Sequence, residues 1–219
     1  MFRSVRVIGH GRVGSSLDAR LRERGIRVDE PDAELVLVCV PDSAIHDVAA
    51  GIEVGPWIAH ASGATSLAAL DPHVHRFGLH PLQTFTRARG PEQLDGAWAA
   101  ITAETDAARV RGFWLADCLG LRPFEVPEKS RVLYHAGAAM ASNFLVTLYR
   151  SASRLFNQAG APPEALLPLL QRTIDNGFEL TGPIARGDWS TVDAHLSAIR
   201  AAAPELENLY LALAHATVP

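Results

Sequence analysis

Near its amino terminus the sequence reads Val5-Arg6-Val7-Ile8-Gly9-His10-Gly11-Arg12-Val13-Gly14, in which three glycines follow a short apolar run. The run is typical of a buried strand, and a helical pattern begins at Val13. Gly9 is predicted to form a tight turn, Gly11 to let the backbone approach a phosphate, and Gly14 to let the helix pack closely on the strand. The free N–H groups of that helix would face the phosphate. The stretch therefore predicts the phosphate-binding turn of a dinucleotide-binding domain; the alternative is a glycine turn in a fold that binds no nucleotide.

Acidic residues twenty positions further on bear on the choice of nucleotide. Asp29 lies where an acid that holds the ribose 2′-hydroxyl is expected, counted from Gly9. Glu30 and Asp32 would repel a 2′-phosphate and favour NAD, whereas Arg12 could reach a phosphate and favours NADP. The predicted cofactor is therefore NAD or NADP, and the alternative for this segment is a solvated acidic turn. Only a few residues separate this acidic segment from the next predicted strand, too few for the usual second crossover helix. The part of the pocket that would hold the adenine is therefore predicted to be reduced.

Strand-like and helix-like patterns alternate through the first half of the chain. Leu35–Val40 is a continuous apolar run rich in valine, which is typical of a central parallel strand covered on both faces. Further predicted strands are Trp57–Ala61, Arg76–His80, Ala97–Ala103 and Pro123–Val126. The alternation implies an α/β fold with a Rossmann-type doubly wound parallel sheet. We place the end of this dinucleotide-binding domain near Val126, so that it comprises residues 1–126.

The second half, residues 127–219, has no convincing strand pattern and is predicted to be an all-α C-terminal domain. Pro127 suits the first position of a helix, and Gly137 is the one interior break before Gly160. This spacing predicts a single helix of about 30 residues. Apolar residues cover much of its circumference, so it should be buried, in part against a second subunit. We therefore predict that this domain contributes to substrate binding and forms a homodimer through the long helix.

The overall composition limits the classes of function. The formal net charge is −4, whereas a nucleic-acid-binding face is basic, so nucleic acid is not an expected partner. No apolar run is long enough to span a membrane, so a membrane is not an expected partner either. Cys39 and Cys118 are the two cysteines, and so few thiols favour a reducing, cytoplasmic location over a disulfide framework. The histidines lack the spacing of a metal site, and no metal is predicted.

Four later segments carry polar motifs at the ends of predicted elements. They are His60–Ala64, Gly78–Phe85, His135–Asn143 and Thr181–Asp188. Together with the glycine turn they resemble a group of bacterial Rossmann-like proteins related to 6-phosphogluconate dehydrogenase, whose C-terminal helical domain has no assigned function. More distantly, the layout is similar to pyrroline-5-carboxylate reductase, ketopantoate reductase and prephenate dehydrogenase. This resemblance implies that a small-molecule substrate binds between a nucleotide domain and a helical domain.

The resemblance to prephenate dehydrogenase also implies a catalytic pair. Those enzymes carry a Ser at the end of one strand and a His-Pro at the end of the next, and Ser62 and His80 match them in kind and order. The nicotinamide would lie near these residues and Val40-Pro41, because ligands bind beyond the carboxyl ends of parallel strands. An imidazole in this position could exchange the proton that accompanies hydride transfer. The alternative is that His80 only braces the turn at Pro81.

Three polar residues of the predicted long helix are further candidates. Ser142 and Asn143 follow His135 by seven and eight residues, which would place all three on one helical face that closes the cleft. Lys129 and Asn143 are fourteen residues apart, so the Lys–Asn dyad of β-hydroxyacid dehydrogenases, with its four-residue spacing, is absent. The alternative is that Ser142 and Asn143 satisfy backbone groups between the domains.

Three other residues are predicted to contact substrate. Gln83 belongs to the motif that contains His80. Thr181 is similar to the threonine of a loop in pyrroline-5-carboxylate reductase. Arg186 could clamp a substrate carboxylate through two hydrogen bonds; the alternative is a turn between helices in which Arg186 pairs with Asp188.

These motifs predict an NAD- or NADP-dependent oxidoreductase that acts on a small carboxylate-bearing carbonyl, imine or alcohol in the cleft between the two domains. The alternatives are a non-catalytic nucleotide-sensing or partner-binding dimer and a purely structural dimerisation module. The predicted catalytic residues are His80, Ser62, His135 and Asn143. The predicted cofactor contacts are Gly9, His10, Gly11, Arg12, Val13, Gly14, Asp29, Val40 and Pro41. The predicted substrate contacts are Gln83, Ser142, Thr181 and Arg186.

Overall fold

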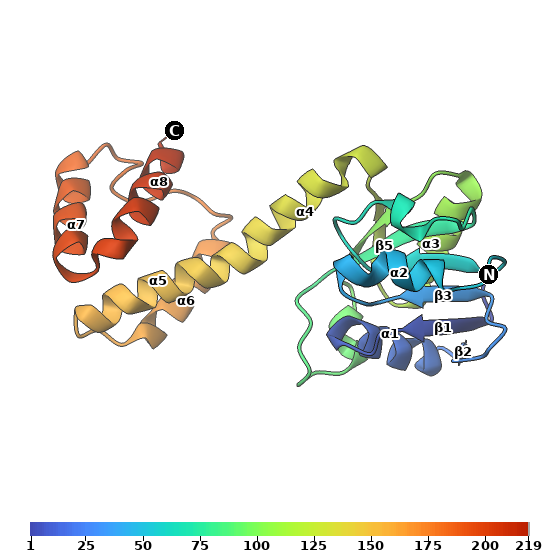
Figure 1. Cartoon of the computed structure of the whole chain (residues 1–219). Helices are drawn as coiled ribbons and strands as arrows, with labels where there is room; N and C mark the ends of the chain where they lie inside the picture. The colour runs from blue at the N-terminus through green and yellow to red at the C-terminus, as the bar shows by residue number, and fades with distance from the viewer. Residues whose placement is uncertain (219) are drawn as a thin grey trace. The chain divides into compact units, whose positions relative to one another are not determined.

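The computed structural model describes residues 1–218, and its amino-terminal part is built on a seven-stranded sheet (Figure 1). The strand order is β2-β1-β3-β4-β5-β6-β7. The strands are β1 (Ser4–Ile8), β2 (Arg27–Val28), β3 (Leu35–Val38), β4 (Trp57–His60), β5 (Arg76–Leu82), β6 (Trp98–Thr102) and β7 (Arg122–Glu125). The α-helices are α1 (Arg12–Glu23), α2 (Ile45–Ala50), α3 (Asp106–Cys118), α4 (Arg131–Ala139), α5 (Leu145–Gln158), α6 (Leu166–Asp175), α7 (Trp189–Ala202) and α8 (Glu207–Thr217).

The sheet is parallel throughout except at one pair of strands. β5 and β6 are antiparallel, with Leu82 opposite Trp98, whereas the other neighbouring strands run parallel. Because β6 starts at the edge where β5 ends, residues 83–97 connect them without a crossover helix. The predicted Rossmann-type doubly wound α/β sheet is thus confirmed, and the antiparallel pair is the exception to its parallel order.

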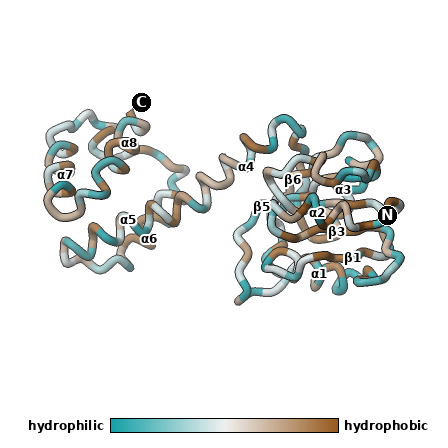
Figure 2. The backbone as a smooth tube through the Cα atoms, viewed as in Figure 1, coloured by the Kyte–Doolittle hydropathy of each residue, from teal (hydrophilic) through white to brown (hydrophobic). Residues whose placement is uncertain are grey.

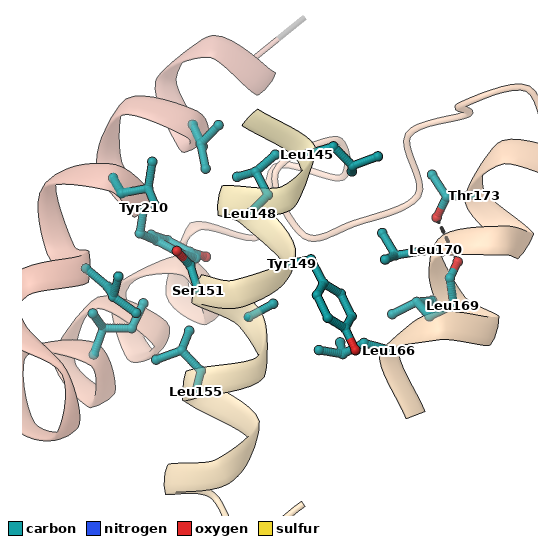
Figure 3. A pocket seen from close by; sticks show the side chains of 15 residues that line it. Leu145, Leu148, Tyr149, Ser151, Leu155, Leu166, Leu169, Leu170, Thr173 and Tyr210 are labelled. Atoms are coloured by element: carbon teal, nitrogen blue, oxygen red, sulfur yellow. Dashed lines mark hydrogen bonds between the residues drawn. The ribbon is translucent and has the colours of Figure 1, made fainter. Parts of the chain in front are cut away.

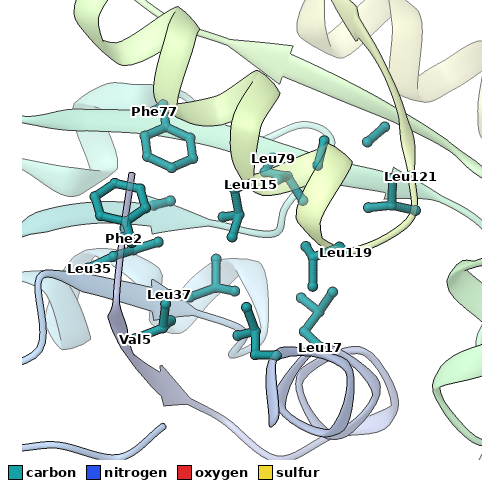
Figure 4. Packing of buried hydrophobic residues seen from close by; sticks show 14 of the residues in the cluster. Phe2, Val5, Leu17, Leu35, Leu37, Phe77, Leu79, Leu115, Leu119 and Leu121 are labelled. Carbon is teal, nitrogen blue, oxygen red and sulfur yellow. The ribbon is translucent and has the colours of Figure 1, made fainter. Parts of the chain in front are cut away.

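Helices cover both faces of the sheet, as the apolar pattern of the central strand requires. Leu35 and Leu37 of β3 pack in one cluster with residues of α1 and α3 (Figure 4). Val36 and Val38 pack in a second cluster with residues of α2. All four residues of this strand are buried, and successive side chains point to opposite faces. Figure 2 shows β1 and β3 as hydrophobic stretches within this part of the chain.

The connection from β2 to β3 is short, as the sequence predicts. Residues 29–34 form turns and bends with no helix. Asp29 adopts a φ of 68°, and its backbone N–H donates to the carbonyl of Val5. The usual crossover helix is therefore replaced by a turn, and the end of β2 is held directly against β1.

The contacts between Cα atoms divide the chain into two units, Met1–Met140 and a second that starts at Ala141. We call them the sheet unit and the helical unit. The domain boundary that the sequence predicts near Val126 falls just after β7. The division by contacts falls later in the chain, and it assigns α4 to the sheet unit. The helical unit contains α5, α6, α7 and α8, and the residues described there form no strand.

The predicted long helix is interrupted by a change of helical type. Residues 131–158 are helical without a gap, but Met140–Phe144 form a π turn between α4 and α5. A π turn holds more residues than an α turn, so it alters the phase of the helix. The shared face predicted for His135, Ser142 and Asn143 assumed a regular α-helix and does not follow from this backbone.

No helix among residues 1–218 is long and apolar enough to cross a membrane. Cys39 and Cys118 are both free thiols. Burial raises the pKa of Cys39 to about 12, so this thiol, which lies beside the glycine turn, stays protonated near pH 7.

Candidate functional site at the carboxyl edge of the sheet

The glycine turn between β1 and α1 has room for a side chain at only one of its three glycines. Gly9 has a φ of 99°, and a Cβ there would lie 2.6 Å from the carbonyl oxygen of Cys39. A Cβ on Gly14 would lie 1.8 Å from the carbonyl oxygen of Gly9. A Cβ on Gly11 would meet nothing within 4 Å. Two glycines therefore pack the helix against the sheet, and the third leaves open space over the start of α1.

The amino terminus of α1 is uncapped. Its N-cap residue is Gly11, no side chain accepts from its first turn, and that turn carries no acidic residue. The hydroxyl of Ser15 donates to the carbonyl oxygen of His10, 3.0 Å away. Its proton is therefore used within the protein and is not directed to the open space over the start of α1. His10 and Arg12 are exposed, and Val13 is half-buried. Unused N–H groups at the positive end of a helix favour an anion.

A loop with two arginines lies beside this helix end. His10, Arg12, Arg87 and Arg89 contribute to the walls of a cavity of about 410 Å³. Gln93 is buried and organises the loop: its Oε1 accepts from the N–H of Thr86 at 2.8 Å, and its Nε2 donates to the carbonyl of Arg89 at 2.9 Å. The loop therefore has a fixed shape that adds positive charge near the uncapped helix.

Two residues predicted from sequence have local partners near this cavity. Gln83 donates from Nε2 to the carbonyl of Gln93 at 3.1 Å, which ties the two ends of the arginine loop together. Asp29 forms an exposed ion pair with Arg22, 2.6 Å away, and Arg22 also pairs with Asp18. The proposed roles of Gln83 toward substrate and of Asp29 toward ribose remain predictions.

Ser62 organises the turn after β4. Its hydroxyl lies 2.9 Å from Oδ2 of Asp42 and 2.9 Å from the hydroxyl of Thr65. The backbone N–H groups of Ala64 and Thr65 donate to the same oxygen, and Ser62 is 8% exposed. The oxygen is thus engaged by the loop itself. Asp42, which follows Val40-Pro41 at the end of β3, is joined to the end of β4 through this contact.

His80, Tyr134 and His135 form a cluster at the end of β5. Nδ1 of His80 lies 2.8 Å from the hydroxyl of Tyr134, and the rings of His80 and His135 are 5.6 Å apart. A Cβ on Gly63 would lie 2.5 Å from Cδ2 of His135 and 2.9 Å from Cε1 of His80. The missing side chain at position 63 therefore lets both rings pack against the turn after β4. Two predicted catalytic residues are brought together here.

A buried positive charge lies behind this cluster. Arg131 is 2% exposed; its Nη1 donates to the hydroxyl of Thr102 at 2.7 Å and its Nη2 donates to the carbonyl of Ser62. A Cβ on Gly78 would lie 2.7 Å from Nη1, so this glycine makes room for the guanidinium. No carboxylate of the part of the chain that is described lies within ion-pair distance of Arg131.

Burial and this charge keep the neighbouring histidines neutral. Burial lowers the pKa of His80 to about 4, and repulsion from His135 and Arg131 adds to the shift. Burial, followed by repulsion from Arg131, lowers the pKa of His60 to about 4. His60 is fully buried, and neither ring nitrogen has a hydrogen-bond partner among residues 1–218. Burial raises the pKa of Tyr134 to about 12, so its hydroxyl is protonated at pH 7.

The remaining predicted residues belong to the helical unit. Asn143 is exposed in the π turn, and Ser142 precedes it there. Arg186 donates to the carbonyl of Thr181, and both residues are exposed. Asp188 caps α7 by accepting from the N–H of Thr191, and it forms no ion pair with Arg186 in the described chain.

Three residues of this edge were missed by the sequence-based reasoning. Arg131, Tyr134 and Asp42 carry no motif of their own. Arg131 and His135 are four residues apart, which places them on one face of a helix. This spacing could have identified Arg131 as a neighbour of His135. Among the residues described, no group of three His, Cys, Asp or Glu side chains could hold a metal ion.

The depressed pKa values predict a pH-dependent stability. The unfolded chain takes up protons on His60 and His80 near pH 6.5, whereas the folded chain does so near pH 4. Stability is therefore complete above about pH 6.5 and is lost as the pH falls toward 4, by up to about 1.4 kcal/mol per pH unit for each histidine. Urea unfolding monitored by tryptophan fluorescence at pH 7 and pH 5 measures this loss.

The His60→Asn variant should lose less stability between these two pH values than the unmodified protein. His46→Asn is the matched control, because the His46 side chain is 67% exposed, and its loss should equal that of the unmodified protein. Equal losses in all three proteins would contradict the neutral, buried state of His60.

Solved structures with the same fold show low sequence identity to the chain. A candidate NADP oxidoreductase from Bacteroides fragilis is 22% identical, with a TM-score of 0.81 over 98% of this chain and 97% of that one. A protein from Thermotoga maritima is 22% identical, with a TM-score of 0.76 over 96% and 95%. Prephenate dehydrogenase from A. aeolicus, in complex with hydroxyphenyl propionate and NAD+, is 12% identical, with a TM-score of 0.51 over 60% and 62%.

These likenesses confirm the predicted resemblance at the level of the fold. No curated protein matches the chain in sequence. The family described as Domain of unknown function (DUF2520) matches residues 97–217, which run from the residue before β6 to the end of α8 and make up more than half of the chain. The chain therefore belongs to the DUF2520 family.

Proposed function

We propose that this protein is an NAD- or NADP-dependent oxidoreductase that acts on a small carboxylate-bearing carbonyl, imine or alcohol. The observation that carries the proposal is a neutral His80, hydrogen-bonded to Tyr134, at the same sheet edge as an open glycine turn. The description of the Bacteroides fragilis protein as an NADP oxidoreductase and the NAD+ in the A. aeolicus enzyme agree with it.

The residues of the glycine turn fit the diphosphate of a dinucleotide. The open space over Gly11 is the volume that a Cβ would fill, and the uncapped N–H groups of α1 point to an anion there. Arg12 supplies positive charge beside it. Asp29 would hold the ribose, and Val40-Pro41 would line the path toward His80. When bound, the nicotinamide would supply or accept a hydride at the substrate carbon.

His80 is suited to proton exchange rather than to charge neutralisation. Its ring is neutral at pH 7, so it can donate from one nitrogen and accept at the other. Ser62 holds Asp42 and the turn after β4, and therefore positions the edge against which His80 and His135 pack. The buried charge of Arg131 favours negative charge on a substrate oxygen nearby. Contacts from Asn143, Ser142, Thr181 and Arg186 remain part of the proposal.

Cofactor binding tests this function first. Titration of the protein with NADH and NADPH, followed by nucleotide fluorescence, should show saturable binding of at least one of them. Gly11→Val should weaken that binding tenfold or more, which corresponds to about 1.4 kcal/mol, because its side chain occupies the space predicted for phosphate. The fold should survive, since a Cβ on Gly11 meets nothing within 4 Å.

Gly51→Val is the matched control, because Gly51 also flanks a helix with a negative φ, as the C-cap of α2, and lies outside the glycine turn. Its affinity should equal that of the unmodified protein. Absence of binding at millimolar nucleotide, or equal affinities for both variants, would contradict the proposal. Tight binding without turnover of any 2-oxo acid, imine or hydroxy acid would instead favour the nucleotide-sensing alternative, which the trimmed β2–β3 connection also supports.

We further propose that the helical unit forms a homodimer. An apolar cavity of about 410 Å³ lies between α5, α6 and α8 (Figure 3). Leu145, Leu148, Leu169 and Leu213 line it, and Leu169 is 60% exposed. Exposed apolar surface of this kind is typical of an interface. The occupant that we propose is the same surface of a second copy, as the sequence of the long helix predicts.

The mass of the protein in solution tests the dimer. Light scattering should give a mass near twice that of the chain, which is 23.5 kDa. Leu169→Asp should dissociate the dimer, because it places a charge in the apolar interface. Val110→Asp is the control, since Val110 is 52% exposed on α3 of the sheet unit. A monomeric unmodified protein, or a Leu169→Asp dimer as stable as the control, would contradict this assembly.

A further inference from the structure

A tyrosine and a histidine are paired beside the turn that follows β4. The hydroxyl of Tyr134 lies 2.8 Å from Nδ1 of His80, and the two rings meet edge to face with their centres 5.6 Å apart. Phe124 also packs edge to face on Tyr134, at 5.9 Å. Tyr134 and His80 are half-buried, so packing fixes the pair while leaving part of it accessible.

The pair lies at the edge of the sheet where ligands are expected. His80 is near the carboxyl end of β5, and the turn at Gly63 follows β4. A Cβ on Gly63 would lie 3.0 Å from Nδ1 of His80, so only a glycine lets the turn pass this close to the nitrogen that faces Tyr134. Ligands of parallel sheets bind beyond these strand ends, which places the tyrosine hydroxyl within the region proposed for substrate.

The protonation states allow a proton to pass through the pair. Tyr134 keeps its hydroxyl proton at pH 7, and His80 holds a single ring proton. Burial opposes a second proton on His80, and repulsion from His135 and from the buried Arg131 adds to this effect. Which nitrogen of a neutral imidazole carries the proton is set by the hydrogen bond that the ring makes.

We propose that Tyr134 is a catalytic residue whose hydroxyl donates a proton to the substrate oxygen or nitrogen, while Nδ1–H of His80 replaces that proton. The inference rests on the oxidoreductase function proposed above. It assigns to His80 the role of a relay and to Tyr134 the contact with substrate. Arg131 acts through His80 and is a positioning residue.

The step balances in the reductive direction. A bound reduced nicotinamide would supply a hydride for a new C–H bond at the substrate carbon, while the π bond of the C=O or C=N group breaks toward its oxygen or nitrogen. That atom takes the proton of Tyr134, the tyrosine oxygen takes the Nδ1 proton of His80, and Nε2 of His80 takes up one proton from the solvent, so that one hydride and one solvent proton are added to the substrate overall. The product is an alcohol or an amine.

The protein without nucleotide gives the first test. Nitrogen NMR of histidine-labelled protein should show His80 protonated at Nδ1, donating to Tyr134. In Tyr134→Phe the acceptor is lost, and the population protonated at Nε2 should rise. Tyr210→Phe is the matched control, because Tyr210 makes the same 2.8 Å contact with Nδ1 of His195 in the helical unit. It should leave the His80 signals unchanged. An unmodified protein with His80 protonated at Nε2 would overturn the proposal.

Turnover gives the second test, measured as NADH or NADPH oxidation with a panel of 2-oxo acids. Tyr134→Phe should lower kcat about 100-fold, within the range for loss of a proton donor, with nucleotide affinity unchanged within twofold. Tyr210→Phe should keep full activity. An active Tyr134→Phe variant with kcat close to that of the unmodified protein would overturn the relay. An unmodified protein that oxidises neither nucleotide contradicts the oxidoreductase function. The NMR result is independent of turnover and still shows whether Nδ1 of His80 donates to Tyr134.

Discussion

The close approach of α1 to β1 is the constraint on which the sheet unit depends. A side chain at Gly14 would overlap the carbonyl oxygen of Gly9, 1.8 Å from its Cβ, and a side chain at Gly9 would press on the backbone of Cys39. These contacts cannot relax without moving β1 or β3, because they involve backbone atoms. They bring the uncapped end of α1 to the carboxyl edge of the sheet, where Gly11 leaves it open to an anion.

A second constraint lies at the same edge, around the buried guanidinium of Arg131. It donates to the hydroxyl of Thr102 on β6 and to the carbonyl of Ser62 after β4, so it joins α4 to one strand and to the turn that follows another. A buried charge without an ion pair is costly unless hydrogen bonds or nearby negative charge offset it. Burial is the main cause that disfavours protonation of His60 and His80, and repulsion from Arg131 adds to it. The buried environment of this edge therefore affects both its stability and the protonation of its histidines.

The sequence predicts the fold well where local pattern decides it. The apolar run at Leu35–Val38 identifies a central strand, and the short segment after Asp29 correctly excludes a crossover helix. The direction of β6 depends on pairing between distant strands, which no local pattern encodes. No sequence pattern indicated the π turn at Met140–Phe144. This turn changes the helical phase, so His135 and Asn143 cannot be placed on one face by their spacing alone. At the site, resemblance selected His80, whereas its partner Tyr134 is identified only by a contact between residues 54 positions apart.

Under the proposed function, the glycine turn and the His80 cluster form one nucleotide-dependent site on the sheet unit. Amide NMR shifts measured during titration with NADH and NADPH test it most directly, because they report every contacted backbone N–H. We expect saturable shifts at Gly11, Arg12 and Val13, together with shifts at Gly63 and Tyr134. Shifts absent from the glycine turn, or confined to it at saturation with none near Gly63 and Tyr134, would contradict a single site of this kind.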